Sequence, residues 1–126
     1  MLKRTSFALC LLLFGCFTTP ATKERVEWYR HFHLQQLTEA QKKVQGTEAQ
    51  LKRAELSADA TLILKMIGKE LSRTIEETRL KIERGDFGSS DNLPSSYGPV
   101  IVSIEGDTME FDLLFKSAVG EANKNK

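Results

Sequence analysis

The chain lacks the features that mark a disulfide scaffold, a nucleic-acid-binding protein or a membrane-spanning protein. Its 126 residues include only two cysteines and three prolines. Eighteen basic residues nearly balance 17 acidic ones, so no field of one sign is present to gather nucleic acid. The longest apolar run, residues 7–17, is shorter than the roughly 20 residues that a bilayer-spanning helix needs.

Residues that would indicate an enzyme or a metal protein are also missing. There is no glycine-rich phosphate loop, and the serine pairs at 89–90 and 95–96 have no nearby base to activate them. His31 and His33 are the only histidines, and residues two apart on a helix point away from each other. Glu27 and His31 share a helix face, but two ligands are too few for a structural zinc site. We therefore expect a non-catalytic protein with no cofactor or metal.

The stretch Leu13-Phe14-Gly15-Cys16 is the most informative part of the chain. It closes an apolar run that follows Lys3 and Arg4, and a small residue precedes the cysteine. This arrangement resembles the signal sequence of a bacterial lipoprotein. The resemblance is confined to this segment, and it implies that residues 1–15 are removed and that lipid is attached to Cys16. Because Phe17 is not the aspartate of the retention signal, the resemblance also implies an outer-membrane protein that faces the periplasm.

Plain secretion is the alternative interpretation. Thr19-Pro20-Ala21 places small residues one and three positions before a cut after Ala21, and both cysteines would then leave with the signal. An uncleaved signal or a eukaryotic one is a third interpretation. Lipoprotein processing leaves Cys16 as the only cysteine, so neither cleavage permits an intramolecular disulfide. A domain this small then depends on helix packing or on a partner.

Residues 22–84 contain no proline and have glycine only at 46 and 68, which favours helix. Two apolar seams run through this region with helical spacing. They lose phase between Ala58 and Ala60, where Ser57 is a suitable N-cap. We expect a helical hairpin here, with one long coiled-coil-like helix as the alternative. The first seam is His33, Leu37, Ala40, Val44, Thr47, Leu51, Ala54 and Ala58, and the second is Ala60, Leu64, Ile67, Leu71, Ile75, Thr78 and Ile82.

A β-hairpin is predicted near the C-terminus. Residues 85–98 are rich in Gly, Ser, Asn, Asp and Pro and indicate a loop, and Gly85 suits a helix end. Two strand-like runs flank Gly106-Asp107, which fits a type II′ turn. The expected fold class is therefore mainly α with a small β element: a hairpin over 99–116 followed by a disordered tail over 117–126. One hairpin face would carry Val100, Val102, Ile104, Met109, Phe111 and Leu113.

Two groups of residues are candidate contact sites. Trp28, Tyr29 and Phe32 form the one aromatic cluster, and they either lie at the membrane interface or pack within the protein. The second group combines the richer helical seam with the largest residue of the hairpin. It would bind a partner by helix packing or strand addition. Its members are Leu64, Ile67, Leu71, Ile75 and Phe111.

The expected function follows from these segments. Residues 16–21 would form a lipidated tether that holds the helical region, 22–84, at the membrane. We expect an accessory or scaffold subunit of an envelope assembly, such as a secretion, conjugation or outer-membrane complex. The alternatives are a periplasmic coiled-coil spacer that self-associates, including as a homodimer, and a plainly secreted small helical binding protein.

Overall fold

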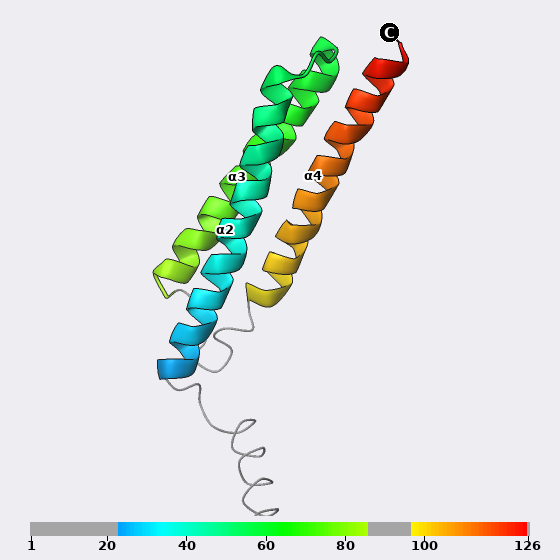
Figure 1. Ribbon diagram of the computed structural model, residues 1–126. Coiled ribbons are helices and arrows are strands. Elements are labelled where there is room, and N and C mark those ends of the chain that lie inside the picture. The colour runs from blue at the N-terminus through cyan, green and yellow to red at the C-terminus, as the bar shows by residue number, and fades with distance from the viewer. Residues whose placement is uncertain (1–22, 86–96, 126) are drawn as a thin grey trace, which may run out of the picture.

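Three long helices make up the described part of the protein. The computed structural model describes residues 23–85 and 97–125, and these form α2 (Lys23–Arg53), α3 (Ala58–Glu83) and α4 (Gly98–Lys124). Figure 1 shows an elongated bundle in which α3 runs back along α2 and α4 runs in the same direction as α2. The expected signal, the tether with Cys16, and most of the expected loop at 85–98 lie outside the described residues.

The break between α2 and α3 falls where the two apolar seams lose phase. Lys52 and Arg53 occupy the last turn of α2. The predicted cap is confirmed, because the Ser57 hydroxyl accepts a hydrogen bond from the Ala60 amide at 3.2 Å. Asp59 lies in the first turn of α3, where the helix dipole favours negative charge. The chain therefore folds back on itself, and a single long helix over 22–84 is excluded.

The two seams face each other across the bundle and form most of its core. Leu71 and Ile75 are buried, as their place on the second seam predicts. The polar members of the seams satisfy their hydroxyls locally: Thr78 donates to the Thr74 carbonyl at 2.8 Å. The buried seam residues are His33, Leu37, Ala40, Val44, Thr47 and Leu51 on α2, and Leu64, Leu71, Ile75, Thr78 and Ile82 on α3.

The predicted C-terminal β-hairpin is wrong. No strand occurs in residues 23–85 or 97–125, and α4 runs through Gly106-Asp107 without a turn. It also continues to Lys124 through the segment that was expected to be a disordered tail. With this correction, the described part of the chain is an all-helical, three-helix bundle.

Burial at helical spacing explains why α4 replaces the hairpin. Its buried residues recur every three or four positions and face α2 and α3: Ile101, Ile104, Thr108, Phe111 and Phe115. The six apolar residues of the predicted hairpin face are divided between two sides of the helix. Only Ile104 and Phe111 of that set are buried. A lone two-stranded hairpin is marginal in water, whereas a helix satisfies its own backbone and buries both phenylalanines.

Close packing and a few polar contacts set how the helices fit together. Gly68 lies under the Phe111 ring, and a Cβ at position 68 would be only 2.9 Å from Phe111 Cζ. Gln36 Nε2 donates to Glu105 Oε1 at 3.2 Å, which joins the first half of α2 to α4. The Gln36–Glu105 bond places the first half of α4 beside the first half of α2.

Candidate interaction surfaces

Most of the residues predicted to bind a partner are part of the core. Leu64, Leu71, Ile75 and Phe111 are buried, and Ile67 is partly buried against them. They hold α3 to the rest of the bundle, so their side chains are mainly engaged within the protein. Ile67, Leu71 and Phe111 nevertheless reach the surface together, because they line a groove between α3 and α4.

We call this groove the α3–α4 groove, and it has a volume of about 400 Å³. Its rim carries two large apolar side chains from different helices, Met66 on α3 and Leu114 on α4. They are 63% and 42% exposed, respectively. The complete lining consists of Met66, Ile67, Glu70, Leu71, Thr74, Asp107, Glu110, Phe111 and Leu114.

The α4 wall of the α3–α4 groove is acidic. Asp107 and Glu110 contribute from α4, and residues 98–112 of that helix contain four acidic side chains and no basic one. Glu70 contributes from α3, where a hydrogen bond from Arg73 lowers the pKa of its carboxyl group. Because Arg73 already pairs with Glu70, the carboxylates available to a partner are those of α4, and the groove suits an apolar ridge with basic residues on that side.

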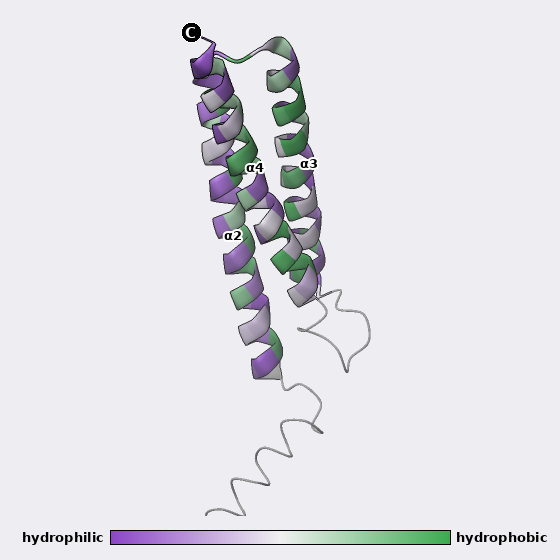
Figure 2. Ribbon diagram, turned by 90° about the vertical axis from the view of Figure 1, so that its right-hand side faces the viewer, coloured by the Kyte–Doolittle hydropathy of each residue, from purple (hydrophilic) through white to green (hydrophobic). Residues whose placement is uncertain are grey.

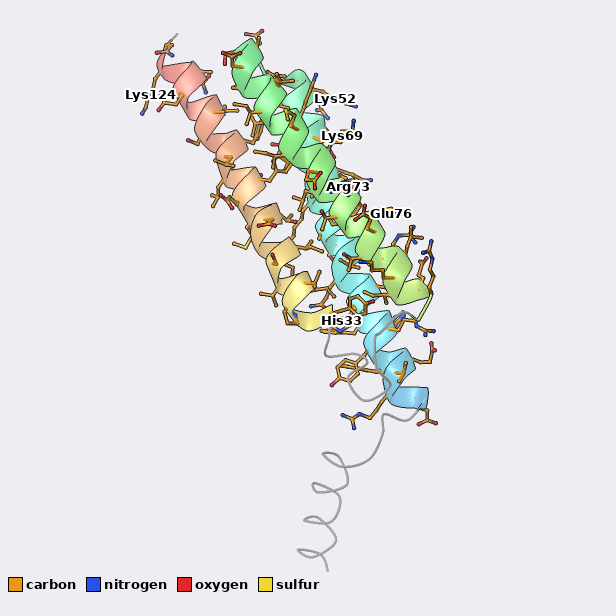
Figure 3. The ribbon with its side chains drawn as sticks, turned by 180° about the vertical axis from the view of Figure 1, so that it is seen from behind. His33, Lys52, Lys69, Arg73, Glu76 and Lys124 are labelled. Carbon is orange, nitrogen blue, oxygen red and sulfur yellow. The ribbon has the colours of Figure 1, made fainter. Side chains whose placement is uncertain are left out.

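Ion pairs cover the exposed face of the second half of α3, whereas Leu62 and Ile63 are exposed near its start. Arg73 pairs with Glu70 and with Glu77, and Arg79 repeats the pattern with Glu76 and Glu83. Figure 3 shows Arg73 and Glu76 on this outer side of the bundle. Such pairs three and four residues apart are typical of a solvated helix surface.

A second exposed apolar surface runs along α4, opposite its buried side. Val102, Met109 and Leu113 are 69%, 64% and 62% exposed. We call these three residues the outer stripe. In Figure 2, apolar segments are conspicuous on α3 and on the lower part of α4, while α2 is mostly hydrophilic on the side shown. The sequence placed the outer stripe inside a hairpin, and a helical projection of 98–124 would have revealed it.

The aromatic cluster occupies the first turns of α2. The rings of Trp28 and Phe32 stack with centroids 5.3 Å apart, and Tyr29 meets Trp28 edge-on at 5.0 Å. Trp28 is 60% exposed and Phe32 is 42% exposed. The cluster ends at His33, which is buried with its Nδ1 atom 3.0 Å from Gln36 Oε1.

The described residues hold no cluster of metal-binding side chains. Glu27, which shares a face with His31, forms an ion pair with Arg30 at 2.7 Å. Across residues 23–85 and 97–125, no three His, Cys, Asp or Glu side chains gather as metal ligands would. No helix in the same residues has the length and apolar character needed to cross a membrane.

Comparison with known proteins adds no constraint on function. No protein family, curated protein or solved structure matches the chain. Function is therefore inferred from the N-terminal sequence and from the surfaces of the bundle.

Proposed function

We propose that the protein is a lipid-anchored, non-catalytic adaptor of a bacterial outer membrane. Acylated Cys16 would hold the bundle at the periplasmic face of the membrane, and the α3–α4 groove would bind a helix of a partner protein in an envelope assembly. The stretch Leu13-Phe14-Gly15-Cys16 supports the anchor. Several acyl chains on one residue bind a membrane stably, whereas a single chain binds only marginally.

The α3–α4 groove carries the proposal of a protein partner. Met66 and Leu114 are exposed on its two sides, above a floor that contains Leu71 and Phe111. Amphipathic helices insert apolar anchors into grooves of this kind. The carboxylates of Asp107 and Glu110 favour a partner helix whose apolar ridge is flanked by Lys or Arg.

A self-associating spacer is the second candidate, and the outer stripe favours it. Val102, Met109 and Leu113 lie on one line along α4, with the spacing of a helix–helix seam. The charges beside the stripe oppose this arrangement. Glu105 and Glu110 lie on either side of it, so two copies packed through the stripe would bring acidic side chains together. A basic partner helix in the α3–α4 groove avoids this repulsion.

Site-specific photo-cross-linking in living cells tests the adaptor proposal. A photoreactive residue is placed at Met66 or at Leu114, with Lys42 on the exposed face of α2 as the control position. We expect one adduct from the two groove positions and none from Lys42. The cross-linked peptide should map to an amphipathic helix with basic flanks, and Leu114→Glu should weaken the adduct formed from Met66. Equal adducts at all three positions would contradict the proposal, and an adduct with a second copy would favour the spacer.

A further inference from the structure

The aromatic end of α2 is exposed in a way that the bundle does not explain. Trp28 and Phe32 lie four residues apart, stack on each other and remain 60% and 42% exposed. Isolated apolar residues are common on protein surfaces, but two adjacent large rings form a patch. Tyr29 extends this patch with a ring that carries a polar hydroxyl. Trp and Tyr rings of this kind favour the headgroup level of membranes, where one end of the ring is in an apolar and the other in a polar setting.

The rings lie at one end of the bundle, where α2 is only partly covered: Tyr29 is half-buried, and Phe32 also lines a cavity that Met109 of α4 borders. Figures 1 and 3 show the turns of α2 before His33 extending past the ends of α3 and α4. His33 is the first fully buried residue of α2, about 15 Å along the helix from Lys23. The rings therefore belong to the end of the bundle at which the chain leads toward Cys16.

The length of the tether keeps the rings close to the proposed lipid. Seven residue steps separate Cys16 from Lys23, and a fully extended chain would span at most about 25 Å over them. Trp28 lies only about 8 Å farther along the helix. The interfacial layer of a bilayer is about 5–8 Å thick on each side. An acylated Cys16 would thus keep Trp28 within at most about 33 Å of the lipid, so the rings can reach the headgroups without any change in the bundle.

The charges of these turns indicate that the rings, rather than electrostatic attraction, would make the contact. Lys23, Arg25 and Arg30 are nearly balanced by Glu24 and Glu27, and the Arg30 guanidinium donates to Glu27 at 2.7 Å. We infer that Trp28, Tyr29 and Phe32 insert into the headgroup region of the membrane that carries the lipid anchor, and so fix the tilt of the bundle on its surface. This inference rests on the proposed anchor. It implies that neutral lipid suffices and that salt has little effect.

Trp28 is the only tryptophan, so its fluorescence reports directly on this contact. The full mature protein is purified, its acylation at Cys16 is established by intact mass, and it is reconstituted in phosphatidylcholine vesicles. Some vesicles contain lipids brominated near the headgroups, and others contain lipids brominated near the acyl-chain ends. We expect Trp28 emission to be quenched more by the shallow bromines than by the deep ones, with no change in high salt.

Two variants connect the quenching to the aromatic end. Phe32→Ser removes the ring stacked on Trp28, and it should reduce the quenching while the helical circular dichroism is unchanged. Leu113→Ser removes an exposed apolar side chain farther along α4 and should leave the quenching as it is. If the Trp28 emission of the acylated protein is the same in plain and in brominated vesicles, the inference is overturned. Stronger quenching by the deep bromines than by the shallow ones would also overturn it. Absence of acyl mass on Cys16 would instead overturn the anchor.

Discussion

At the scale of single residues, packing between Phe111 and Gly68 positions α4 on the bundle. The Phe111 ring is fully buried, and its Cζ atom would be 2.9 Å from a Cβ at position 68. From the sequence, Phe111 was identified as the largest residue of an apolar face, but that face was expected in a strand and not in a helix. The sequence did not mark Gly68 as a contact residue, because a glycine within a predicted helix does not reveal whether it is buried or exposed. Gly46 shows the contrast, since a Cβ there would meet nothing within 4 Å.

Alanine at these two glycines should therefore have opposite effects. Gly46→Ala should stabilise the protein by up to about 1 kcal/mol through helix propensity. Gly68→Ala gains the same propensity but forces the buried Phe111 ring to move, and the net result should be a destabilisation of about 1–3 kcal/mol. Urea unfolding measures both changes. Equal stability of the two variants would show that α4 does not pack on Gly68.

Leu71 shows how deeply the apolar seam of α3 is buried. Leu71 is buried in the core and also reaches the floor of the α3–α4 groove. Leu71→Ala should lower the free energy of unfolding by about 2–4 kcal/mol, because the truncated side chain leaves a cavity. A loss below about 0.5 kcal/mol in urea melts would indicate that the seam is largely exposed in the isolated protein.

At the scale of elements, the sequence predicts α2 and α3 well and α4 poorly. The seams from His33 to Leu51 and from Leu64 to Ile82 each have a single period, and burial follows them closely. Residues 98–115 fit two periods at once, because apolar side chains occupy both alternate positions and every third or fourth position. Local β-propensity and the Gly106-Asp107 pair favoured the hairpin. The helix forms instead because it buries Phe111 and Phe115 against α2 and α3.

Val102 and Ile104 separate these two structures in one experiment. They share a face of the predicted hairpin, yet in α4 Val102 is exposed and Ile104 is buried. Val102→Ser should change the free energy of unfolding by about 0.5 kcal/mol or less. Ile104→Ser should cost about 3 kcal/mol or more, because it leaves a cavity and buries a hydroxyl. Similar losses for the two variants in chemical denaturation would argue for the hairpin.

The ion pairs along α3 predict a small dependence of stability on pH. Hydrogen bonds from Arg73 and Arg79 lower the pKa values of Glu70 and Glu76 from the ordinary value of 4.5. A carboxyl group whose pKa is lowered by folding stabilises the folded state above its ordinary pKa. That stabilisation is lost as the pH falls through the lowered pKa.

The double substitution Arg73→Gln and Arg79→Gln should remove this contribution. Its stability should differ from that of the unaltered protein at neutral pH, and the difference should shrink as the pH falls below about 4.5. Because the partners are exposed or, for Arg79, half-exposed, the difference should be small and should decrease in high salt. A difference between the proteins that stays constant from neutral to acidic pH would show that the pairs are not responsible.

At the scale of the whole molecule, the account joins a lipid at one end of the chain to a binding groove on the bundle. The anchor depends on sequence alone, because Cys16 lies outside the described residues. The groove depends on structure alone, since only the packing of α4 on α3 brings Met66 and Leu114 to the same surface. The two parts make one functional unit only if the mature chain begins at Cys16.

The intact mass of the protein extracted from membranes tests this point most directly. The account predicts a chain that begins at Cys16 and carries the added mass of several acyl chains. It also predicts that Cys16→Ser blocks this maturation, so that no acylated protein is recovered from the membrane fraction. A mature chain in the soluble fraction that begins at Thr22, with no added mass, would contradict the account and establish plain secretion.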